Sequence, residues 1–239
     1  MANDREKKVG RGCTSYNNEY FQKTAESDYA KYGFVCKEGS EWDKYLTIQR
    51  KTSKYGTLTD KRDGKTYYTI KIGEQTWMAE NLNFDYKVNG VTYGTVADLE
   101  NGDVYGRRYS WSAAMDSAGV FSTTSKGCGF GIYCEVSTRA RGVCPEGWHL
   151  PTQNEWESLY SAMGGSPYAM QAKGFEVWPN ATDAYGFSVL PQNSRSEFWT
   201  ASQRSTVLAY YWTLTADAAE IADEYKQWRY PVRCLKDPD

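Results

Sequence analysis

The sequence lacks several features on which common functional assignments depend. It has one histidine in 239 residues and no C-x-x-C pair, which disfavours a zinc site because such sites cluster cysteines and histidines. No apolar run approaches the ~18 residues that a transmembrane helix needs. The 28 basic and 30 acidic residues give a net charge of -2 with no basic stripe, so neither nucleic acid nor an anionic membrane is expected as the main partner.

Candidate catalytic groups are equally sparse. His149 lies between Trp148 and Leu150, whereas a Ser-His or Cys-His mechanism requires an exposed histidine beside a nucleophile. We therefore expect a packed, hydrogen-bonded imidazole. Glycoside hydrolysis needs two facing carboxylates, and of the candidates Asp183 and Glu155 the second is already explained by helix capping. No catalytic residue is predicted, and an enzyme of unknown type remains only an alternative.

Aromatic residues, in contrast, are abundant. Nine Trp, 20 Tyr and 8 Phe make up 15% of the chain. A buried phenol needs a hydrogen-bond partner, so many of these side chains are expected to be half-exposed on a surface that makes contacts by stacking. The alternative is that tyrosine serves here as an ordinary strand former in a β-rich protein.

Cysteine usage points to an oxidising compartment. The six cysteines are an even number, which fits disulfide formation in an extracellular or cell-surface protein. Six cysteines allow fifteen connectivities, so their count does not settle the pairing. Residues 1–10 are polar and lack the apolar core of a signal peptide, so an export signal is expected to have been removed or replaced.

The chain divides into two parts of different character. Residues 1–57 are predicted to form an appendage with one modest helix over Tyr16–Lys31, closed by a disulfide, because their apolar content is too low for a separate core. Residues 58–239 form the main domain. There, Lys65–Ile72 and Gln75–Met78 predict a β-hairpin, and 86–103 predicts a loop.

The second half of the main domain predicts two helices followed by strands. Ser110–Ala118 has helical spacing of apolar residues. Thr152–Met163 begins with a capping box, in which the side chains of Thr152 and Glu155 bond each other's backbone amides. Four short strands should follow, over Phe187–Leu190, Phe198–Ala201, Tyr210–Leu214 and Val232–Leu235. Helices segregated from strands in this way indicate an α+β domain.

Several motifs occur in order along residues 57–237. The most specific spans Gly142–Trp156 and contains Cys-Pro-Glu-Gly-Trp-His-Leu-Pro-Thr. The others are Asp63–Tyr67, Thr76–Asn83, Tyr105–Trp111, Asp183–Ser188, Phe198–Ser202 and Val232–Cys234. Together they resemble the Fibrobacter succinogenes major paralogous domain, which implies an exported or cell-surface bacterial protein.

The resemblance also implies a fold. The family is similar to the C-type-lectin-like and formylglycine-generating-enzyme group, which implies an α+β, C-type-lectin-like fold of short antiparallel strands with two main helices, stapled by disulfides. Formylglycine chemistry needs a cysteine pair late in the domain, whereas Cys128 and Cys134 precede the Leu-Pro-Thr helix. A stapled loop is therefore expected there. The predicted disulfides are Cys13–Cys36, Cys128–Cys134 and Cys144–Cys234.

The sequence departs from the family pattern in two places. Only Gln192–Glu197 separates Leu190-Pro191 from Phe198-Trp199, where members usually carry a longer insertion, and Trp228–Pro231 stands where the family tends to have Gly-Phe-Ser. Both places are where lectin-like folds build ligand loops, so the ligand is expected to differ.

A binding role is the leading functional hypothesis. No cofactor is expected; calcium is considered because of Asn180, Asp217, Asp223 and Glu224, although the usual lectin calcium signatures do not occur. Sugar rings need only exposed aromatics with polar neighbours. The candidates are Trp178, Tyr210, Trp212, Tyr225 and Trp228. Tyr210 and Trp212 share a strand face opposite to that of Tyr211, and either face could be core. The expected partner is a polysaccharide or surface glycan; the alternative is another surface protein bound without sugar.

Overall fold

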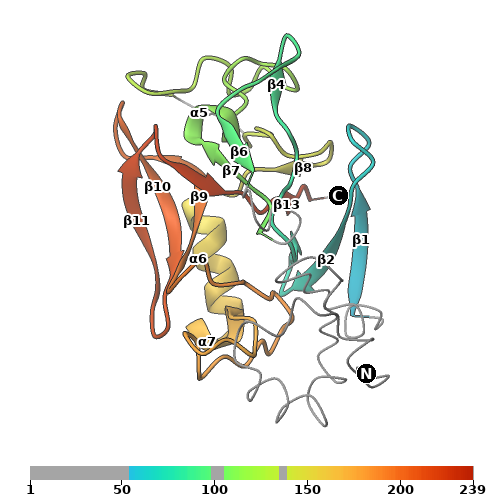
Figure 1. The fold of residues 1–239 in the computed structure, drawn as a ribbon, viewed down its shortest axis with the longest axis vertical. Coiled ribbons are helices and arrows are strands. Elements are labelled where there is room, and N and C mark those ends of the chain that lie inside the picture. The colour runs from blue at the N-terminus through green and yellow to red at the C-terminus, as the bar shows by residue number, and fades with distance from the viewer. Residues whose placement is uncertain (1–53, 98–104, 135–138, 239) are drawn as a thin grey trace, which may run out of the picture.

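The computed structural model describes residues 54–97, 105–134 and 139–238 (Figure 1). The predicted helix over Tyr16–Lys31 and the predicted Cys13–Cys36 disulfide lie outside these residues. The first strand, β1, begins at Tyr55. Three residues of this strand, 55–57, were predicted to belong to the N-terminal appendage, but they are part of the main domain.

Among the described residues the largest sheet has five strands, and it includes β13 (Leu235–Lys236), the last strand in sequence order. Its order is β1 (Tyr55–Thr59), β2 (Thr66–Ile72), β3 (Gln75–Met78), β13 and β8 (Trp148–His149). The β2–β3 hairpin confirms the prediction, and Gly73 turns between the strands at φ 57°, a conformation that costs glycine little. The strand predicted over Val232–Leu235 begins only at Leu235, where β13 pairs with both β3 and β8.

A second antiparallel sheet carries the aromatic core. It orders β11 (Ala219–Tyr225), β10 (Leu208–Leu214) and β9 (Ser196–Gln203). The predicted strands at 198–201 and 210–214 are present and longer than expected, and β11 is an addition. Figure 1 shows α6 (Gln153–Ala162) lying along this sheet. Trp156 of α6 stacks on Trp212 of β10, with ring centroids 5.8 Å apart and planes at 10°.

The prediction of a loop over 86–103 is wrong, because three short strands lie within this range. Two of them form a separate hairpin, β4 (Lys87–Val88) with β5 (Val91–Thr92). A third sheet orders β12 (Arg229–Pro231), β7 (Arg107–Ser110) and β6 (Thr95–Ala97). Asn89 and Gly90 both have positive φ, 51° and 81°, which is the turn that Asn-Gly favours in two-residue hairpins. The Asn-Gly pair is therefore a hairpin turn.

The helices agree with the prediction to different degrees. For α6 the capping box is confirmed, since Thr152 Oγ1 accepts from the amide of Glu155 and the Glu155 carboxylate accepts from that of Thr152. The helix predicted over 110–118 is only α5 (Trp111–Ala114), and a further short helix, α7, covers Pro167–Met170. The strand predicted over 187–190 is reduced to a single bridge between Val189 and Gln171.

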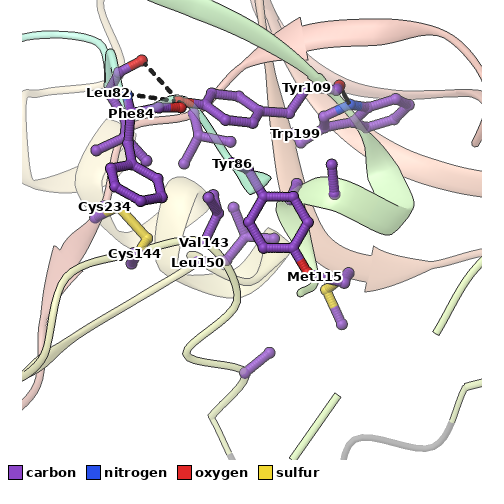
Figure 2. Packing of buried hydrophobic residues seen from close by; sticks show 14 of the residues in the cluster. Leu82, Phe84, Tyr86, Tyr109, Met115, Val143, Cys144, Leu150, Trp199 and Cys234 are labelled. Atoms are coloured by element: carbon purple, nitrogen blue, oxygen red, sulfur yellow. Dashed lines mark hydrogen bonds between the residues drawn. A yellow bond between two sulfur atoms is a disulfide. The ribbon is translucent and has the colours of Figure 1, made fainter. Parts of the chain in front are cut away.

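The buried phenols have hydrogen-bond partners. Tyr109 is fully buried, and its hydroxyl donates to Phe84 O at 2.8 Å and accepts from the Phe84 amide at 3.0 Å (Figure 2). Burial raises its pKa well above the usual value. The indole of Trp199 donates to Tyr109 O at 2.6 Å. Many of the aromatic residues are thus core residues.

Two of the predicted disulfides are present, Cys128–Cys134 and Cys144–Cys234. The second lies inside the core, where both of its cysteines are fully buried (Figure 2). Small antiparallel sheets with few helices agree with the α+β class. Among the described residues, no helix is long and apolar enough to cross a bilayer.

Candidate functional site

Two of the five predicted ligand-binding aromatics are in the core. Trp178 is 1% exposed and Trp212 is 2% exposed. Trp212 lies between Trp156 and Tyr160 of α6, because α6 covers this face of β10. Both residues correct the prediction, since a buried indole cannot stack on a ligand. Tyr210, on the same strand face as Trp212 and two residues before it in β10, is half-buried.

The other two predicted residues lie together on the surface. Tyr225 ends β11 and is 52% exposed, and Trp228 follows in the turn to β12 and is 58% exposed. The Trp228 amide donates to Tyr225 O at 2.9 Å, which closes the turn. Both line an open groove of ≈ 420 Å³, whose other lining residues are Val96, Arg108, Gln227 and Arg229. We call this the Trp228 groove.

A buried lysine holds the turn of the Trp228 groove in place. Lys226 is 1% exposed, and its ammonium donates to Gly129 O, Ile132 O and Gln203 Oε1 at 3.2, 3.0 and 2.7 Å. It also lies 4.4 Å from the ring centroid of Trp111. Burial lowers the pKa of Lys226 to about 8. These three acceptors satisfy all three N–H groups of the Lys226 ammonium. Lys226 is therefore held in place, and it lies in the turn between Tyr225 and Trp228.

The same lysine also holds the loop Cys128–Cys134 in place, through its bonds to Gly129 O and Ile132 O. Its side chains Phe130, Ile132 and Tyr133 are exposed. The loop is closed by its disulfide and by Gln203, whose Nε2 donates to Cys134 O at 2.7 Å. The disulfide of this loop was predicted from the sequence, whereas its apolar side chains were given no role, although apolar residues in a glycine-rich stapled loop were a usable signal. They lie near the turn that carries Trp228.

A cluster of tyrosines and one carboxylate lies beside the Trp228 groove. The Tyr230 ring centroid is 4.7 Å from that of Trp199 and 4.8 Å from that of Tyr211. Burial, and then the neighbouring Tyr211, raise the pKa of Tyr230. Burial also raises the pKa of Glu197, against the opposing effect of Arg195 and Arg108. Arg195 Nε lies 2.5 Å from Glu197 Oε1, so this carboxylate already has a partner.

The single histidine holds the end of the chain in place. His149 is 2% exposed, with Nδ1 2.7 Å from Asp237 Oδ1 and Nε2 3.0 Å from Glu155 Oε1. Both ring nitrogens are therefore engaged, as expected for a packed imidazole. Burial would raise the pKa of Glu155, but hydrogen bonds from His149 and Thr152 outweigh it and hold the pKa below its usual value.

We expect Glu155→Gln to remove a pH dependence of stability. Because the folded-state pKa of Glu155 is lowered, its carboxylate stabilises the fold above the ordinary value of 4.5, and this contribution is lost as the pH falls through the lowered value. The variant should be about 1–2 kcal/mol less stable at pH 7 and converge with the wild type at low pH. Urea unfolding between pH 7 and 3 measures this. Glu157→Gln, on the exposed face of α6, is the matched control; a gap that stays constant with pH would contradict the assignment.

The acidic residues considered for calcium do not converge. Asp217 accepts from Tyr168 Oη at 3.2 Å, Asp223 pairs with Arg204, and Glu224 accepts from the Tyr225 amide at 2.8 Å. Within residues 54–97, 105–134 and 139–238, no three acidic, cysteine or histidine side chains are grouped as metal ligands.

Comparison with known protein families identifies a match. The family model described as the Fibrobacter succinogenes major domain matches residues 70–236, more than half of the chain. Neither a curated protein nor a solved structure matches significantly.

Proposed function

Because the chain belongs to the Fibrobacter succinogenes major domain family, we propose that it is an extracellular or cell-surface binding module of lectin-like fold that binds carbohydrate in the Trp228 groove. The observation that carries the proposal is the pair Tyr225 and Trp228, both more than half exposed and lining one groove with Arg108, Gln227 and Arg229. Flat apolar rings next to hydrogen-bonding side chains suit sugars, which present both apolar ring faces and hydroxyl groups.

Two further features support the proposal. The turn that carries Trp228 is anchored by Lys226 through three hydrogen bonds, and a preformed surface loses little conformational entropy on binding. Two disulfides, Cys128–Cys134 and Cys144–Cys234, suit the oxidising surroundings of an extracellular protein. The role requires no catalytic group.

Trp228→Ala tests the proposal. Affinity gel electrophoresis against soluble polysaccharides, with cellulose and xylan pull-downs, should show retention of the wild type. The variant should lose at least about 2 kcal/mol of binding free energy, roughly 30-fold in affinity, if Trp228 is a central contact. Tyr185→Ala removes an exposed tyrosine outside the groove and should bind as the wild type does. No retention of the wild type on any glycan, or equal retention of the Trp228 variant, would refute the proposal.

A second candidate is a surface that binds another protein. The exposed Phe130, Ile132 and Tyr133 of the Cys128–Cys134 loop favour it, because apolar side chains gathered on a surface are typical of protein interfaces. Light scattering after size exclusion distinguishes the two candidates. Self-association that is lost in both Trp228→Ala and Tyr133→Ala, without glycan binding, would favour the protein interface.

A further inference from the structure

The Trp228 groove is positively charged as well as aromatic. Its lining includes two arginines, Arg108 and Arg229, and, among the described residues, no carboxylate. The chain as a whole has a net charge of -2, so this positive charge is a local feature and does not follow from the composition.

The strand register places the two guanidinium groups on one face. In the third sheet Arg108 pairs with Pro231 and with Val96, while Arg229 pairs with Ser110. Residues 108 and 110 share a face of β7, as do 229 and 231 of β12. Arg108 and Arg229 are therefore diagonal neighbours, a relation that separates side chains by about 7–8 Å. Both stand beside the exposed Trp228.

Two carboxylates near the groove, those of Glu197 and Glu224, have partners of their own. Glu197 is 8% exposed and pairs with Arg195. Glu224 accepts a hydrogen bond from the amide of Tyr225. Arg108 lies near enough to Glu197 to oppose the rise of its pKa, and Arg229 is exposed at the rim. A ligand in the groove would thus meet the exposed guanidinium of Arg229, with Arg108 beside it in the lining.

From this geometry we infer that the groove binds an acidic polysaccharide, with a sugar ring on Trp228 and a sugar carboxylate on Arg229 and Arg108. The inference rests on the proposed function and adds the chemical class of the ligand. A guanidinium group binds a carboxylate through two parallel N–H···O bonds. The aromatic rings can also stack on a sugar ring, a contact that a polyanion without sugar rings cannot make.

A matched pair of polymers tests the inference. Polygalacturonate carries one carboxylate per sugar, and its methyl ester has the same backbone without charge. With EDTA present, so that no divalent cation bridges protein and polymer, affinity electrophoresis should show the acid form bound about tenfold more tightly than the ester, as expected for loss of a charge-assisted hydrogen bond. Alginate, an acidic polymer of other sugars, should also be bound, because the inferred contact is with the sugar carboxylate.

Three variants separate the contributions. Arg229→Gln should lose about tenfold in affinity for the acid polymer and bind the ester unchanged, whereas Trp228→Ala should lose both polymers. Lys71→Gln removes one positive charge from β2, in another sheet, and should bind as the wild type does. Polyglutamate, which has charge without sugar rings, should bind far more weakly than polygalacturonate.

The failures are distinguishable. Equal binding of acid and ester, or an Arg229→Gln variant with wild-type affinity, would overturn the ligand class while Trp228-dependent retention kept the proposed function. Equal binding of polyglutamate would also overturn the inference, because charge alone would then account for retention. No retention on these or on neutral polysaccharides would overturn both.

Discussion

Removal of the Cys144–Cys234 disulfide is expected to lower the free energy of unfolding by about 4–5 kcal/mol. The bridge joins residues 90 positions apart, and in the chain-entropy model a longer closed loop restricts the unfolded chain more. Both cysteines are fully buried, so alanine substitution also removes packed sulfur atoms from the core. Guanidinium unfolding of Cys144→Ala/Cys234→Ala measures the loss.

The second disulfide is the internal control for this experiment. Cys128 and Cys134 are only 6 positions apart, so Cys128→Ala/Cys134→Ala should cost only about 2 kcal/mol by the same model. Equal losses from the two double variants, or a larger loss from the short loop, would show that loop length does not govern their contributions.

Trp212→Ala is expected to destabilise the domain by about 3–5 kcal/mol, because deleting a large buried side chain leaves a cavity. Trp212 is 2% exposed and stacks on Trp156. In the described residues its indole nitrogen has no hydrogen-bond partner, so the loss would come from packing. Trp228→Ala, with its side chain 58% exposed, should change stability by no more than about 0.5 kcal/mol.

Thermal and urea unfolding of these two variants provide the measurement. Trp212→Phe keeps an aromatic ring in β10 that can pack against α6, so this variant should recover part of the lost stability. Comparable destabilisation by Trp212→Ala and Trp228→Ala would contradict the assignment of the first residue to the core and the second to the surface. The same pair of variants shows whether loss of glycan binding by Trp228→Ala reflects the groove or the fold.

Features encoded in neighbouring residues were predictable from the sequence. The capping box of Thr152 and Glu155 defines the start of α6, and alternation in Thr66–Ile72 defines β2. In contrast, β11 was not predicted, since Ala219–Tyr225 has few strand-forming residues and is a strand because it pairs with β10 along its whole length. Such pairing depends on residues distant in sequence.

The candidate site was predictable only in part, for a similar reason. Tyr225 and Trp228 were selected correctly as exposed, but Trp178 and Trp212 were not. The sequence around a tryptophan does not show whether a helix covers its side chain. In this domain α6 packs on one face of β10 and makes that face part of the core. Arg108 was missed because it joins Trp228 only through the β7–β12 register. Arg229 follows Trp228 directly in the sequence, but it was given no role.

The position of β13 has a consequence for how the domain is made. Leu235 pairs with both Trp77 and His149, so an inner strand of the largest sheet is synthesised after the strands on either side of it. Until then β3 and β8 each present an unpaired edge, and such edges favour wrong pairings between chains. The domain is therefore expected to complete its fold only after synthesis has passed residue 236. Slow synthesis between β8 and β13 would lengthen the time during which a nascent chain needs a chaperone.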